Sequence, residues 1–233
     1  MVSQITTGYP TDHDGRPYRR RRYRAAGVFM AILVVLGLVV WVVALTGSEA
    51  SATPTECNEP TAASATPSAA STATTSAAAT TRAVVKRDDM LSETPAPLST
   101  FQVRVLNAST QRGAAQSVSN DLTAQGFTPA TDAAYGDDAV YPNHDMNCVA
   151  QIRFGPAGKA SAAAVWIAVP CAQLINDGRR GTDVDVALGE YYHGAEQSQD
   201  AQAALEALRS ADPKNPKTGV DPGLVSAVHA QKC

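Results

Sequence analysis

The sequence predicts an α/β (α+β) sandwich, one small domain that follows a single transmembrane helix and a disordered linker. Three observations lead to this prediction. Residues 25–45 contain no charged side chain. Residues 48–81 consist mostly of Ala, Ser, Thr and Pro. From residue 101 onward, alternating apolar segments are interleaved with segments of helical periodicity over about 90–110 residues, a normal size for one hydrophobic core.

The apolar segment 25–45 is predicted to be a transmembrane helix. As a helix it would be about 32 Å long, close to the ~30 Å hydrocarbon thickness of a bilayer. Residues 1–24 contain six arginines and two aspartates, and the next basic residue after the segment is Arg82. The positive-inside rule places residues 1–24 in the cytoplasm and the rest outside. A cleaved signal peptide is the rival interpretation, but it would have a shorter apolar core of about 7–15 residues.

Residues 48–99 are predicted to be a disordered linker. This stretch contains too little large apolar surface to offset the entropy that ordering it would cost. We expect a flexible tether that lets an exported domain work at some distance from the membrane.

The exported domain is assigned to residues 101–193. It should begin with an alternating strand over 101–106. A helix follows, with Ser109 or Thr110 as its possible cap, apolar residues at helical spacing between 114 and 122, and an end at Gly126 in a Schellman stop. An irregular loop is expected over 132–147. The other elements predicted in the domain are strands at 127–133, 149–154, 172–175 (an edge strand) and 183–188, and an Ala-rich helix at 157–169. Residues 194–233 should add an amphipathic helix at 198–210 and a tail that either folds back on the domain or stays loose.

Four cysteines all lie on the exported side, where disulfides are favoured. None forms a CxxC pair or has zinc-finger spacing, so no metal site is expected. Cys148 precedes a predicted strand and Cys171 follows the next helix. Because the helix should run antiparallel to that strand, both cysteines should lie at the same end of the domain. We therefore predict a Cys148–Cys171 disulfide. Cys57 and Cys233 can then pair with each other or with a partner molecule.

The residues that could carry chemistry are few, and we predict neither catalysis nor a cofactor. His144 and Cys148 could form a nucleophilic pair, and Asp183 with Asp185 could act as paired carboxylates, but a structural role fits both patterns. The sequence contains no phosphate-binding glycine loop, GxSxG or HExxH motif. Arg179 and Arg180 are the candidate contacts for an anionic wall polymer or phosphate. Residues 191–193, Tyr-Tyr-His, could stack on a sugar but more simply pack under the last helix.

Charge distribution argues against nucleic acid as a partner. Residues 25–233 contain 13 basic and 20 acidic residues and no basic tract. The lipid bilayer is an expected partner through residues 25–45, and a second copy of the chain is a further option.

Four short motifs resemble the LytR C-terminal domain family. They are Val-Arg-Val-Leu-Asn-Ala-Ser at 103–109, Gly113 with the Gly-Phe pair at 126–127, Arg-Phe-Gly-Pro at 153–156 and Asp-Val-Asp-Val-Ala-Leu-Gly at 183–189. The departures are Ala108, where glycine is usual, and the long loop before Cys148. The match covers about residues 101–189.

This resemblance implies an actinobacterial envelope factor that supports wall integrity, with a part in antibiotic tolerance or virulence. Family members often carry the domain beside a phosphotransferase domain that attaches polymers to peptidoglycan, which is not present in this sequence. We expect a non-catalytic protein that binds wall polymers or wall-assembly proteins. The alternatives are an accessory phosphotransferase-type enzyme and a receptor for a lipid or small ligand.

Overall fold

The computed structural model describes residues 13–14, 24–46, 53–60, 82–194, 197–215 and 218–233. The chain divides into two compact units, Met1–Ala50 and Ser51–Cys233. In the first unit, the 23-residue helix α1 (Arg24–Thr46) covers the predicted transmembrane segment 25–45. Among the residues that the structure describes, no helix combines the length and apolar character that crossing a membrane requires. The spanning role of 25–45 therefore stays a prediction, and most of the predicted cytoplasmic segment 1–24 lies outside the described residues.

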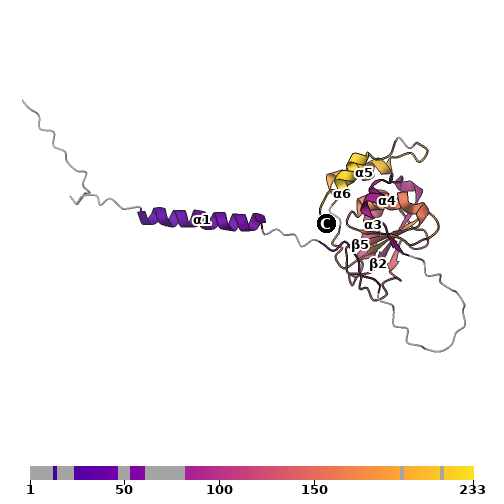
Figure 1. Ribbon diagram of the computed structural model, residues 1–233, viewed down its shortest axis with the longest axis horizontal. Helices are drawn as coiled ribbons and strands as arrows, with labels where there is room; N and C mark the ends of the chain where they lie inside the picture. Colours follow the sequence, from indigo (N-terminus) through magenta and orange to yellow (C-terminus); the bar gives the residue numbers. More distant parts are fainter. Residues whose placement is uncertain (1–12, 15–23, 47–52, 61–81, 195–196, 216–217) are drawn as a thin grey trace, which may run out of the picture. The chain divides into compact units, whose positions relative to one another are not determined.

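The second unit is a mixed α/β domain built on a seven-stranded mixed sheet (Figure 1). The strand order is β1-β6-β5-β7-β2-β3, and β4 also pairs with β2. The β1–β6 and β5–β7 pairs are antiparallel and the others are parallel. The strands are β1 (Ala83–Val84), β2 (Gln102–Asn107), β3 (Thr128–Pro129), β4 (Tyr135–Asp137), β5 (Ala150–Phe154), β6 (Gln173–Asn176) and β7 (Val184–Leu188).

Two layers of helices cover one face of this sheet. Helices α3 (Ala114–Gln125) and α4 (Lys159–Ala168) pack directly on the strands, and α5 (Gln199–Arg209) and α6 (Pro222–His229) pack on the outer side of that first layer (Figure 1). The sequence predicts only a buried stripe on the Ala-rich helix. Instead every residue from Ser161 to Ala168 is buried, because α4 lies between the sheet and the outer helices. Its small side chains let both neighbours approach closely.

The predicted end of α3 and the predicted start of α5 are confirmed by the backbone. The predicted cap of α3 at Ser109 or Thr110 is wrong, because Gly113 occupies the N-cap position. Gly126 adopts the left-handed conformation at φ 104°, where a side chain would be strained. The Phe127 N–H donates to the Leu122 carbonyl and the Gly126 N–H to the Thr123 carbonyl, which is the Schellman pattern. At α5, the Ser198 hydroxyl accepts from the Ala201 N–H and caps the helix.

The prediction of a disordered linker over 48–99 is wrong for residues 53–60 and 82–99, which pack on the domain. Residues 82–99 form β1, α2 (Arg87–Leu91) and the start of a 3₁₀ turn η1 (Leu98–Thr100). Met90 and Leu98 are each 1% exposed, so two apolar anchors hold this stretch in the core. Because β1 pairs with β6, the strand predicted at 172–175 is not at the edge of the sheet. The rest of the linker, 48–52 and 61–81, lies outside the described residues.

The C-terminal tail folds back on the domain, which resolves the two alternatives left by the sequence. Val225 and Val228 of α6 are buried in the main core. The Cys233 carbonyl accepts from the Thr53 N–H, so the last residue meets the first segment of the unit.

Candidate functional site

The sheet has an apolar face and a polar face. Alternate residues of β2, β5 and β7, such as Val103, Ile152 and Val186, point into the main core below the helices. The intervening residues form the opposite surface, which we call the polar face. Its side chains are those of Arg104, Gln151, Arg153 and Asp185, beside a small apolar cluster that includes Tyr141 and Cys148.

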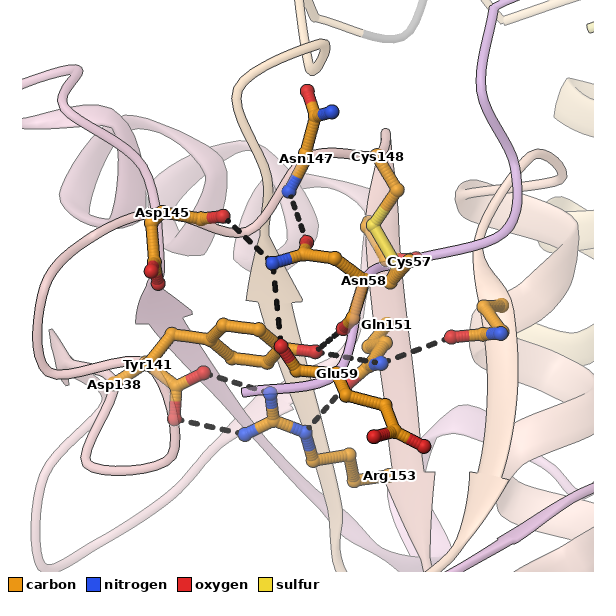
Figure 2. Close-up of a disulfide and its surroundings, with 12 residues drawn as sticks. Cys57, Asn58, Glu59, Asp138, Tyr141, Asp145, Asn147, Cys148, Gln151 and Arg153 are labelled. Carbon is orange, nitrogen blue, oxygen red and sulfur yellow. Dashed lines mark hydrogen bonds and ion pairs between the residues drawn. A yellow bond between two sulfur atoms is a disulfide. The ribbon is translucent and has the colours of Figure 1, made fainter. Parts of the chain in front are cut away.

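Arg153 and Asp138 form a buried ion pair on the polar face. The guanidinium donates from Nη1 and Nη2 to the two carboxylate oxygens at 2.8 and 2.7 Å (Figure 2). Gln151 accepts from the Arg153 Nε–H. The guanidinium carbon of Arg153 lies over the Tyr141 ring, 5.7 Å from the ring centroid. Burial raises the pKa of Tyr141, which therefore stays neutral and donates its hydroxyl to the Asn58 carbonyl. This network joins β5, the loop before it and segment 53–60.

The predicted Cys148–Cys171 disulfide is wrong. Cys148 is bonded to Cys57, with Cα atoms 4.8 Å apart, and Cys171 to Cys233, with Cα atoms 5.6 Å apart. Cys148 and Cys171 do lie at the beginning of neighbouring parallel strands, as the same-end argument requires. The sheet nevertheless separates them, because Cys148 belongs to the cluster on the polar face and Cys171 packs against the main core.

Segment 53–60 is held on the domain by more than its disulfide. Figure 2 shows Asn58 between the loop residues Asp145 and Asn147, donating to the carbonyl of the first and accepting from the N–H of the second. The Val149 N–H donates to the Pro54 carbonyl at the start of β5. The sequence signal for this docking was Cys57 itself, the one cysteine inside a stretch otherwise typical of a linker.

A groove of about 440 Å³ lies on the polar face, at the end away from Tyr141 and Cys148. The predicted contacts Arg179 and Arg180 are among its lining residues. Its walls are polar, with Gln102, Thr131 and Asp183 among them. This volume lies within the range of about 300–1,000 Å³ that is typical of ligand pockets.

The two arginines differ in their surroundings. Arg179 is ion-paired with both Asp177 and Asp185. Burial lowers its pKa, but the hydrogen bonds to the two carboxylates outweigh that effect, and the pKa of Arg179 is raised above its ordinary value. Arg180 is exposed and forms no ion pair within the described part of the chain. Of the predicted pair, only Arg180 is therefore available to an incoming anion.

The other residues proposed as carriers of chemistry have structural surroundings. Cys148, the candidate nucleophile, is bonded to Cys57 and therefore has no free thiol. Asp185 is shared by Arg179 and Arg104, and the Asp183 carboxylate accepts from the Gln102 N–H, so these two do not form a free carboxylate pair. Tyr191, 39% exposed, and the neighbouring His193 lie at a separate cleft beside α6.

Comparisons with known proteins agree with this architecture. The family model described as LytR cell envelope-related transcriptional attenuator matches residues 100–192. The cell envelope integrity protein Cei of Mycobacterium tuberculosis is 38% identical over 236 residues, and the alignment covers 100% of both chains. The chain belongs to the Cei family.

A solved relative supports the same fold. The crystal structure of the soluble domain of a conserved hypothetical secreted protein from Mycobacterium marinum is 40% identical, with a TM-score of 0.57. The match covers 65% of this chain and 97% of that one. Because that soluble domain was crystallised separately, and because residues 51–233 form their own compact unit here, we take 51–233 as a fragment that folds independently. The secreted relative and the two disulfides agree with an extracytoplasmic domain in this member of the Cei family.

Proposed function

We propose that this chain is a membrane-anchored, extracytoplasmic and non-catalytic protein that supports envelope integrity by binding wall polymers or wall-assembly proteins. Full-length similarity to Cei supports the envelope role. Anchoring rests on the uncharged segment 25–45 and the arginines before it.

The observation that carries the binding role is the charge arrangement around the groove. Arg104, Arg179 and Asp185 are engaged with one another or with neighbouring acids, so they hold the walls rather than transfer protons. Of the other polar groups, Arg180, Thr131 and Asp183 are exposed and suited to hydrogen bonds with a hydrated polymer. An anionic glycan would meet Arg180 first.

A pull-down with purified peptidoglycan tests this proposal. The fragment 51–233 must be used, because a fragment that begins after Cys57 would lose the disulfide to Cys148. We expect retention on the wall material, reduced about fivefold or more by Arg180→Glu. The matched variant Arg112→Glu, at an exposed arginine before α3, should be retained like the parent fragment.

Two results would overturn the proposal. One is that the fragment 51–233 binds neither wall polymer nor any envelope protein. The other is turnover of a lipid-linked glycan by the fragment, which would favour the phosphotransferase alternative. The anchoring part is tested separately with a C-terminal tag on the full chain in spheroplasts: added protease should remove the tag, and a protected tag would reverse the assigned topology.

A further inference from the structure

A second hollow, which we call the apolar cleft, lies between the C-terminal end of α4, helix α6 and the loop after β7. Its volume is about 300 Å³. Val149, Ile167, Val169, Ala201 and Val228 line it, together with the Cys171–Cys233 disulfide. These side chains leave an apolar floor that water solvates poorly.

The charged side chains at the cleft are cationic and lie among neutral polar groups such as Gln197 and Gln231. Arg87 from α2 and Lys232 from the tail both contribute to the lining, and both are exposed. Among the described residues that line the cleft, no Asp or Glu side chain is present to neutralise them. An apolar floor with a cationic rim is complementary to a molecule that has an apolar chain and an anionic head.

His229 provides an independent sign of a missing partner. Its ring lines the cleft and stacks on Trp166, with the ring centroids 3.6 Å apart and the planes 21° apart. The residue is only 3% exposed, and neither ring nitrogen has a hydrogen-bond partner in the described part of the protein. A neutral imidazole can donate one hydrogen bond and accept another, and leaving both unmade in a buried place is unfavourable.

We propose that the apolar cleft binds an anionic amphiphile with a single hydrocarbon chain. The chain would lie on the floor formed by α4 and α6, and the anionic head would lie between Arg87 and Lys232, where a small movement of His229 lets its N–H donate to a head-group oxygen. A volume of about 300 Å³ is at the lower end for ligand sites, which favours one chain over two. Fatty acids and single-chain lipid phosphates share this chemistry. The proposal goes beyond wall binding and does not depend on it, because the cleft and the Arg180 groove are lined by different residues.

Titration calorimetry on the fragment 51–233 tests the proposal, with decanoate and decyl phosphate as anionic probes and decanol as the neutral one, all below their micelle concentrations. We expect saturable binding of at least one anion, about tenfold tighter than that of decanol. The stronger of the two anions identifies the head group. Trp166, the single tryptophan of the fragment, should change its emission on binding, because it stacks on His229.

Charge variants test whether the cationic rim is responsible for the preference for anions. The double variant Arg87→Gln/Lys232→Gln should weaken binding of the anion about fivefold to tenfold and leave decanol unaffected. The matched double variant Arg112→Gln/Lys214→Gln, at exposed cations away from the cleft, should bind like the parent fragment. Absence of saturable binding by both anions, equal affinity for decanol, or equal loss in the two double variants would overturn the proposal. Arg180→Glu should leave anion binding unchanged, so failure here is distinct from failure of the wall-binding proposal.

Discussion

Arg153 and Asp138 are fifteen residues apart in sequence and form a bidentate ion pair whose side chains are 3% and 1% exposed. Arg153 lies on the central strand β5, whereas Asp138 belongs to the long loop that departs from the family pattern. The pair therefore fastens this loop to the sheet. The same loop carries Cys148 and the backbone groups that Asn58 binds, so the docking of segment 53–60 depends on where the pair places it.

The first prediction concerns this ion pair. Replacing Arg153 with methionine leaves the Asp138 carboxylate buried without its partner, which should reduce the free energy of unfolding by about 3–5 kcal/mol. Replacing both residues, as Arg153→Met/Asp138→Leu, should cost clearly less, because no charge is then left uncompensated. Urea unfolding of the fragment 51–233 measures both. A double variant as unstable as the single one would show that the pair itself, rather than the orphaned charge, supplies the stability.

The second prediction concerns the two disulfides, which join cysteines 91 and 62 residues apart in the sequence. Removing either should lower the free energy of unfolding by about 2–5 kcal/mol, since each cross-link restricts the unfolded chain. Only Cys57→Ser/Cys148→Ser should also make residues 53–60 sensitive to limited proteolysis under native conditions. If Cys171→Ser/Cys233→Ser exposes the same segment equally, the local role assigned to the Cys57–Cys148 bond is wrong.

Periodicity in the sequence was sufficient to locate the main elements. The alternation around Val103 and Val184 and the helical spacing before Gly126 correspond to β2, β7 and α3. In β2 and α3 one side is buried, and in β7 Val184 and Val186 face the main core. The family resemblance was likewise confirmed, since the family model matches residues 100–192. The spanning role of 25–45 and the identity of the partners remain predictions.

What the sequence could not supply was long-range pairing. Cys148 and Cys171 were correctly expected at one end, but which face of the sheet each occupies depends on strand order and register, and neither is visible in local patterns. The docked stretches 53–60 and 82–99 were missed for a related reason. Their composition is that of a linker, and the few anchors that order them, Cys57, Met90 and Leu98, act only through distant partners.

The third prediction concerns Gly155 in the Arg-Phe-Gly-Pro motif. A Cβ at this position would lie 1.8 Å from the Arg179 carbonyl oxygen, so the strand end and the Arg179 loop approach too closely for any side chain. Gly155→Ala should therefore cost about 1–3 kcal/mol or more and displace the loop that presents Arg180. The control is Gly136→Ala on β4, where a Cβ would meet nothing within 4 Å.

Urea midpoints and wall retention check the Gly155 prediction together. The Gly155 variant should lose both stability and retention on peptidoglycan, whereas the Gly136 variant should stay within about 0.5 kcal/mol of the parent and bind normally. Unchanged retention by a destabilised Gly155 variant would mean that the Arg180 loop does not contribute to wall binding.

The fourth prediction is a pH dependence that arises from His229. Burial, with a smaller contribution from the Arg87 charge, lowers the pKa of His229 from an ordinary 6.5 to about 4. Between these values the unfolded chain binds a proton that the folded domain does not, so acid favours unfolding. The stability contributed by neutral His229 is complete above about pH 6.5 and is lost as the pH falls towards 4, by at most about 1.4 kcal/mol per pH unit.

Phenylalanine at position 229 keeps a ring that can stack on Trp166 and cannot be protonated. The melting temperature of the parent fragment should therefore fall more steeply between pH 6.5 and 4 than that of His229→Phe, and parallel curves for the two proteins would assign the acid sensitivity to other groups.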